Sequence, residues 1–123
     1  MQLNDHTPTP DDISWVRDEV AAIHERNRQR GRAEWCGHDF DFTCPSSVTY
    51  PFQLFWDSCF HAIALSHVGL QKAEAELKSL LKNQHSDGFV SHVTFWQRDA
   101  YEEMVSTYDI AFRSKYLSDE MQP

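Results

Sequence analysis

The sequence predicts an all-α fold with long aromatic loops. Two stretches, residues 10–30 and 70–84, place apolar residues at helical spacing along one stripe. A third stretch, residues 54–68, is apolar on nearly every side and is followed by Gly69. Helices separated by so much aromatic loop do not obviously close a core by themselves. We therefore expect part of a larger helical assembly.

Composition narrows the class of protein. The chain is 41% hydrophobic and 24% charged, as ordinary soluble globular proteins are. Its net charge of -8 argues against a nucleic-acid partner, because phosphate binding needs a basic stripe. No apolar run reaches the roughly 18 residues of a membrane span, and the polar N-terminus does not resemble a signal peptide. The three cysteines lack a CxxC spacing, which indicates reduced thiols and a cytoplasmic location.

The first helix has clear start signals. Thr9 stands at the N-cap, Pro10 lies in the first turn, and the two following aspartates meet the positive end of the helix dipole. Residues 1–9 are expected to be a flexible tail and residues 10–123 the folded part. Gly31 predicts the end of the helix. Four arginines are interpreted as a solvated helix end, in preference to a phosphate site: Arg26, Arg28, Arg30 and Arg32.

The middle of the chain predicts a loop and then a helical hairpin. Residues 32–53 show no sustained period and are interpreted as an ordered loop with room for one short strand. Helices 54–68 and 70–84 should pack antiparallel, with the first buried on most sides. In the second, Glu74 and Lys78 are expected to pair on the outside. Its inward stripe comprises Leu70, Ala73, Leu77, Leu80 and Leu81.

After the hairpin, the segment DGFVSHVTFW begins with a turn at Asp87 and Gly88. Residues 89–96 are interpreted as extended chain, which places His92 and Trp96 on the same side. Aromatic rings beside a histidine fit either a core segment or a wall of a binding pocket. Residues 100–105 have weak helical character.

One carboxylate, Asp57, stands inside the aromatic run TYPFQLFWDSCFHAIAL. Burying a bare charge costs several kcal/mol unless the charge is paired or hydrogen-bonded. Asp57 could meet free backbone N–H groups at a helix start. Alternatively, it could accept hydrogen bonds from sugar hydroxyls while rings such as Tyr50 and Trp56 stack on the sugar. The residues alone leave both interpretations open.

Other chemistry has weaker support. Cys36, His38 and Cys44 could place three metal ligands on one loop of a metal-binding regulator, but their spacing fits no standard zinc motif. We therefore predict no metal and no cofactor. Cys44 and Cys59 lack the motifs of catalytic nucleophiles. No spacing nominates a catalytic pair among the acids considered, which are Asp57, Asp87, Asp109, Asp119 and Glu120.

Residues 42–123, and above all YPFQLFWDSCFHAIAL, resemble glucosidase-I-like inverting glycoside hydrolases, nearest the bacterial mannosylglycerate and glucosylglycerate hydrolases. That family folds as an α/α toroid of helical hairpins. The resemblance implies a partial α/α toroid, truncated at the C-terminus, in which 54–82 is an early hairpin. Tyr50, Trp56 and Asp57 match positions that line the sugar pocket, and Gln122 matches a glutamine that reaches the sugar. His92 and Trp96 complete the predicted substrate-binding set.

The resemblance also implies what this chain lacks. The general acid and general base of the family lie in later hairpins, so no catalytic residue is expected here and the chain alone should be inactive. Its partners would be a small glycoside, such as glucosylglycerate or mannosylglycerate, and the remaining hairpins of the catalytic domain. Leu54 departs from the family pattern, where a second tryptophan is common. The alternative is a non-catalytic helical module that binds a sugar or a protein.

Overall fold

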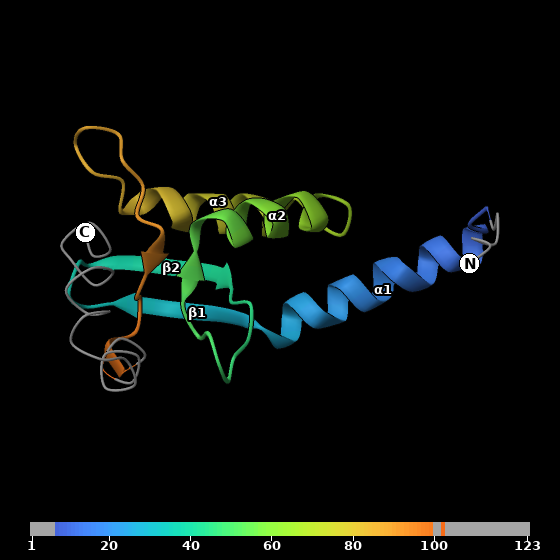
Figure 1. The fold of residues 1–123 in the computed structure, drawn as a ribbon, viewed down its shortest axis with the longest axis horizontal. Helices are drawn as coiled ribbons and strands as arrows, with labels where there is room; N and C mark the ends of the chain where they lie inside the picture. Colours follow the sequence, from blue (N-terminus) through green and yellow to red (C-terminus); the bar gives the residue numbers. More distant parts are fainter. Residues whose placement is uncertain (1–6, 100–101, 103–123) are drawn as a thin grey trace, which may run out of the picture.

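The computed structural model describes residues 7–99 and 102, and in this part of the chain helices combine with two small antiparallel sheets (Figure 1). The elements are α1 (Pro10–Arg26), β1 (Arg28–Ala33), β2 (His38–Thr43), β3 (Gln53–Leu54), α2 (Phe55–Ser66), α3 (Leu70–Lys82) and β4 (Val93–Thr94). The fold is helix-rich as predicted, but all-α is wrong. Weak helical character over 100–105 falls largely outside the described residues. No helix among those described is long and apolar enough to cross a membrane.

The start of α1 is confirmed. The Thr9 hydroxyl accepts a hydrogen bond from the Asp12 N–H at 3.2 Å, and the Asp12 carboxylate accepts one from the Thr9 N–H at 2.8 Å. This reciprocal capping box satisfies two N–H groups at the helix start. The predicted end at Gly31 is wrong, because α1 stops at Arg26 and the next residues pair as a strand. Helix α1 buries none of its residues and extends from the rest of the molecule as an arm (Figure 1).

Strands β1 and β2 form a hairpin where a helix end and an ordered loop with room for one short strand were predicted. The register runs from Arg28 opposite Thr43 to Ala33 opposite His38. Gly31 lies across from Phe40, and a Cβ atom on Gly31 would stand 2.9 Å from the phenyl ring. The glycine is therefore needed for close packing inside a strand, and it does not end a helix.

Three of the four arginines, Arg28, Arg30 and Arg32, belong to this hairpin and not to a helix end, whereas Arg26 is the exposed last residue of α1, as predicted. Arg28 donates two hydrogen bonds to the Asp41 carboxylate, at 2.6 and 2.5 Å. These bonds raise the pKa of Arg28 above its ordinary value. Arg32 makes a single bond of 3.0 Å to Asp39, and both of those side chains are exposed.

Removing Arg28 should therefore matter more than removing Arg32. We expect Arg28→Ala to lower the free energy of unfolding by about 1 kcal/mol, because a half-buried bidentate pair is stronger than an exposed single bond but still screened by water. Arg32→Ala should cost less than about 0.5 kcal/mol. Urea unfolding of both variants measures the difference, and equal losses would contradict the assignment.

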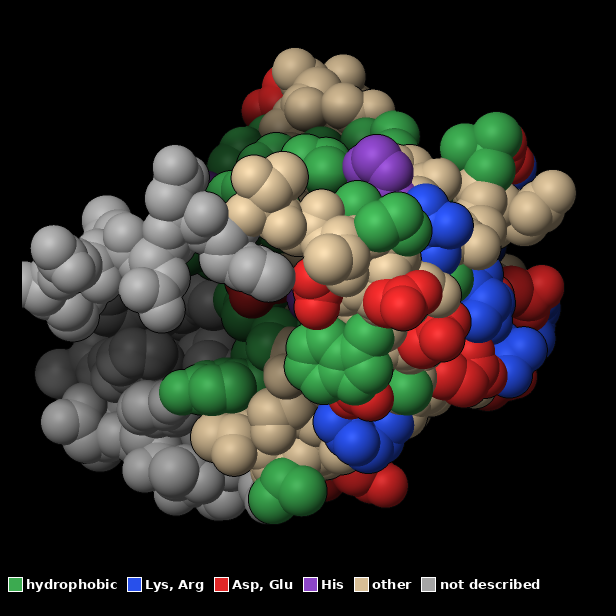
Figure 2. Space-filling model, turned by 90° about the vertical axis from the view of Figure 1, so that its right-hand side faces the viewer, with side chains coloured by type: hydrophobic (Ala, Val, Ile, Leu, Met, Phe, Trp, Pro, Cys, Tyr) green, Lys and Arg blue, Asp and Glu red, His purple; other side chains and the backbone are tan. Residues whose placement is uncertain are grey.

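Helices α2 and α3 lie side by side, as predicted, and they pack over the β1–β2 hairpin (Figure 1). Ala62 and Leu65 of α2 pack on Ala73 of α3. Burial of α2 on most sides is wrong, because no described element covers its outer face. On that face Trp56 is 70% exposed and Phe60 64% exposed, and Ile63 is exposed as well. Figure 2, which looks along α1 from its free end, shows apolar side chains on the surface among charged ones.

Helix α3 turns a partly polar stripe inward. Leu70, Leu77 and Leu81 are exposed, contrary to prediction, while Ala73 and Leu80 are buried as expected. Glu76 and Ser79, which lie between Ala73 and Leu80 along the helix, are also buried. The outward pair of Glu74 and Lys78 is confirmed, at 3.2 Å.

The polar stripe of α3 covers the free edge of β2. The Ser79 hydroxyl accepts from the Asp41 N–H at 2.8 Å and donates to the Asp41 carbonyl at 3.0 Å. Lys82 donates to the carbonyl of Asp39. The helix thus supplies side-chain partners where a third strand would supply backbone ones.

The segment after α3 folds back over the sheet. Its turn is confirmed, with Gly88 at φ +94° and the Asp87 carboxylate accepting from the Phe89 N–H at 2.9 Å. Only Val93 and Thr94 of the predicted extended stretch form a strand, β4, which pairs with β3. Trp96, at the end of this segment, joins the main apolar cluster, whose other members are Ala33, Phe40, Phe42 and Cys44.

Candidate functional site

The first turn of α2 carries Trp56 and Asp57. Its N-cap residue, Leu54, makes no side-chain cap bond, and Asp57 is the acidic residue of the turn. A carboxylate there interacts favourably with the helix dipole. However, Asp57 Oδ2 is buried and finds no hydrogen-bond partner among residues 7–99 and 102. The helix start therefore explains the position of Asp57 but leaves one of its oxygens unsatisfied.

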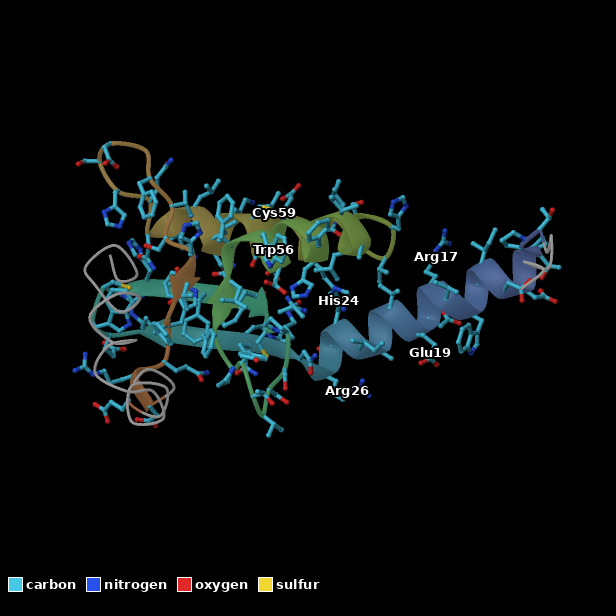
Figure 3. The ribbon with its side chains drawn as sticks, viewed as in Figure 1. Arg17, Glu19, His24, Arg26, Trp56 and Cys59 are labelled. Carbon is cyan, nitrogen blue, oxygen red and sulfur yellow. The ribbon has the colours of Figure 1, made fainter. Side chains whose placement is uncertain are left out.

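Aromatic rings lie near this turn. Trp56, labelled on α2 in Figure 3, contacts only the edge of Phe60 among the ring contacts of the described residues, at 6.1 Å between centroids, and its side chain is exposed. Tyr50 is partly exposed and stands edge-on to Phe52 at 6.0 Å. Exposed rings beside a carboxylate match the chemistry of a sugar-holding surface, since the apolar face of a sugar can stack on a ring.

His92 belongs to the same region through its backbone. Its carbonyl accepts a hydrogen bond from the N–H of Phe55 at 2.9 Å, which ties the β4 segment to the start of α2. The imidazole itself is exposed and stands edge-on to Phe89 at 6.1 Å.

Two predicted site residues do not join this group. Trp96 is 2% exposed and stacks on Phe40 at 5.5 Å, so a sugar contact would need the surrounding residues to move. Gln122 lies outside the described residues. The binding roles of all six predicted residues stay predictions.

A buried polar network, centred on Glu76, lies directly behind the first turn of α2. Glu76 Oε1 accepts from the Ser58 hydroxyl at 2.5 Å, and Oε2 accepts from the Thr43 N–H at 2.6 Å. The Gln53 amide donates to the Ser58 hydroxyl at 2.9 Å and accepts from the Trp96 indole N–H at 2.8 Å. The network therefore connects β2 and β3, one strand from each sheet, to helices α2 and α3.

The sequence carries a signal for Glu76. It stands three residues after Ala73 and four before Leu80, both on the inward stripe of the helix. An acid at such a position must be buried with partners, because an isolated buried charge is too costly. Ser58 has a weaker signal, since small polar residues are common on any helix face.

One histidine, His61, lies near Glu76 and contacts a second histidine, His24. His61 Nδ1 is 3.8 Å from Glu76 Oε1, and the His61 ring stands edge-on to that of His24 at 5.2 Å. His24 lies on the side of α1 that faces α2 (Figure 3). In the described part of the chain no three His, Cys, Asp or Glu side chains are grouped to hold a metal ion.

The cysteines are free thiols. Cys44 donates to the carbonyl of Asn27 at 3.2 Å, and burial raises the pKa of its thiol. A raised pKa keeps the thiol protonated, and the protonated form is a poor nucleophile. Cys44 is therefore a core residue of the sheet.

Comparison with known proteins defines the class. The sequence model of one protein family, described as the mannosylglycerate hydrolase MGH1-like glycoside hydrolase domain, matches residues 50–120 of this chain, which is more than half of it. The matched range includes the aromatic turn, the α2–α3 hairpin and the β4 segment. The chain belongs to this family of glycoside hydrolase domains. No solved structure matches it.

Individual relatives agree with the family. Mannosylglycerate hydrolase MGH1 of Selaginella moellendorffii is 35% identical over 54 residues, which is 44% of this chain and 11% of the relative. Mannosylglycerate hydrolase of Thermus thermophilus is 36% identical over 58 residues, 46% of this chain and 14% of the relative. Glucosylglycerate hydrolase of Mycolicibacterium hassiacum is 34% identical over 53 residues, 43% of this chain and 12% of the relative. The matched stretches thus span a small part of each relative.

Proposed function

We propose that this chain forms part of the sugar pocket of an inverting α-glycoside hydrolase that acts on a small glycoside such as mannosylglycerate or glucosylglycerate. Trp56 and Asp57 hold the non-reducing sugar, with Tyr50 and His92 as further walls. The observation that carries the proposal is the buried, unpartnered Oδ2 of Asp57 beside the open ring of Trp56. Asp57 as a whole is only partly buried, so rotation of its carboxylate would bring that oxygen to a sugar hydroxyl while the sugar stacks on the ring.

The proton transfers are assigned to other residues. In an inverting hydrolase a carboxylic acid protonates the leaving oxygen, and a carboxylate activates water on the opposite face of the sugar. The resemblance of the sequence implies that both groups lie in later hairpins of an α/α toroid. In this proposal Asp57 binds hydroxyls and transfers no proton, and the chain alone is inactive. A cytoplasmic location stays a prediction.

The outer face of α2 supports the proposed protein partner. Phe60 and Ile63 are exposed on it, and large apolar patches on soluble proteins commonly mark interaction sites. We assign the part of this face around Phe60 and Ile63 to contact with the remaining hairpins of the catalytic domain, and leave Trp56 at its edge for the sugar.

The proposal predicts sugar binding that depends on Asp57. The chain should bind mannosylglycerate or glucosylglycerate in an NMR titration, and Asp57→Asn should weaken binding at least about tenfold, because hydrogen bonds to a charged acceptor are lost. Asp11→Asn is the matched control, since Asp11 is also a first-turn acid but lies on α1. It should bind as the wild type does.

Two results would contradict the proposal. One is wild-type chain that binds neither glycoside. The other is release of mannose or glucose by the chain above a blank without protein, which would place catalytic groups within these residues.

A further inference from the structure

The first turn of α2 begins without a cap of its own. Leu54, at the N-cap, has no side-chain oxygen to accept hydrogen bonds from the free backbone N–H groups of the turn. Helix ends fray when they lack such partners. Because the same turn carries Trp56 and Asp57, other parts of the molecule must hold it if these residues are to keep their places.

Two attachments hold the turn. On one side the Phe55 N–H donates to the carbonyl of His92 at 2.9 Å, next to the β3–β4 pairing. On the other side the buried Ser58 hydroxyl donates to Glu76 Oε1 at 2.5 Å. Consecutive helix residues are about 100° apart around the helix axis. Anchoring Ser58 therefore fixes the directions in which residues 56 and 57 point.

Glu76 is held in turn by the sheet. Its second carboxylate oxygen accepts from the Thr43 N–H on the edge of β2 at 2.6 Å. The Gln53 amide donates both to the Ser58 hydroxyl at 2.9 Å and to the Glu76 carbonyl at 3.3 Å. The bond to β2 thus fixes the position of the Glu76 carboxylate. Gln53 bonds to both α2 and α3 and so stabilises the Ser58–Glu76 hydrogen bond between them.

We propose that Glu76 is a positioning residue for the sugar pocket. Through Ser58 it fixes the rotation of the first turn of α2, and hence the placement of Trp56 and Asp57 relative to His92. This inference rests on the proposed function. Glu76 itself is 1% exposed and is assigned no contact with the sugar.

The test compares Ser58→Ala with Ser79→Ala in the full chain. Each variant removes one buried serine hydroxyl that bonds to a neighbouring element. Ser58 links Glu76 to α2, whereas Ser79 links α3 to the backbone of Asp41. Urea unfolding checks that the two variants lose similar stability. The two readouts are the affinity for mannosylglycerate and the hydrogen-exchange rate of the Phe55 amide.

We expect Ser58→Ala to weaken mannosylglycerate binding about tenfold and to speed exchange of the Phe55 amide. Ser79→Ala should change neither by more than about twofold. Equal changes in the two variants would overturn the positioning role. If Ser58→Ala does not fold, Glu76→Gln replaces it, since the glutamine keeps an oxygen for Thr43.

The two proposals fail in different ways. Wild-type chain that binds no mannosylglycerate or glucosylglycerate contradicts the proposed function, and the Phe55 exchange rate then decides the positioning role alone. Faster exchange confined to Ser58→Ala supports it, and equal exchange in both variants overturns it.

Discussion

Replacing Glu76 by alanine is expected to lower the free energy of unfolding by about 3 kcal/mol. The carboxylate accepts hydrogen bonds from the Thr43 backbone and the Ser58 hydroxyl, deep in the interface between α3 and its neighbours. Alanine leaves both donors buried without an acceptor and opens a cavity, and both changes are destabilising. The gain from no longer desolvating a carboxylate offsets part of the loss. Urea unfolding followed by circular dichroism measures the net change.

Glu74→Ala is the matched control for this variant. Glu74 is the same residue type on the same helix, but it is exposed and pairs only with Lys78 among the ion pairs of the described residues. Its removal should cost less than about 0.5 kcal/mol. Similar losses for the two glutamates would show that the buried network is not a source of stability.

The second large effect distinguishes Trp96 from Trp56, both of which the sequence analysis places in the predicted substrate-binding set. Trp96→Ala should lower the free energy of unfolding by about 4 kcal/mol, because a large buried side chain is removed. The indole also donates to Gln53 and stacks on Phe40, and both contacts are lost. Trp56→Ala should change stability by less than about 0.5 kcal/mol, since the ring is exposed.

For Trp56 the large effect should be on sugar affinity and not on stability. Trp56→Ala is expected to weaken mannosylglycerate or glucosylglycerate binding at least about tenfold while the chain keeps its thermal unfolding midpoint. A Trp56→Ala variant that unfolds as easily as Trp96→Ala would show that Trp56 is a packing residue and would remove it from the pocket.

Local signals explain why the start of α1 can be predicted from sequence. The capping box joins Thr9 to Asp12, so every atom involved lies within a few residues. The turn at Gly88 is predictable for the same reason, because a backbone with φ +94° strongly favours glycine.

The β1–β2 hairpin follows a pattern that helix periodicity does not detect. HDFDFT alternates aspartate with phenylalanine, and RQRGRA alternates arginine with small or polar residues. Such alternation has the period of a strand, and it puts the charges of both strands on one face and the phenylalanines on the other. Each strand has only six residues, and Gly31 also fits a helix end, so single-residue stop signals indicate the wrong structure here.

The candidate site shows the same division. Composition and family resemblance single out Tyr50, Trp56 and Asp57, because aromatic rings beside an acid are visible along the chain. Hydrophobicity predicts that α2 needs a cover but does not say which segment supplies it. The support behind the site is non-local, since Ser58 meets Glu76 only after the two helices pack.

The polar network also has a consequence for the order in which parts of the chain fold. Its bonds join residues 33 and 43 positions apart, Thr43 with Glu76 and Gln53 with Trp96, whereas the capping box of α1 closes within three. Distant contacts form slowly because long loops must close first. We therefore expect the arm to become helical early and the network to form after the transition state. Substitutions in the network should then raise the unfolding rate and leave the refolding rate nearly unchanged. They would shorten the lifetime of the folded pocket without slowing its formation.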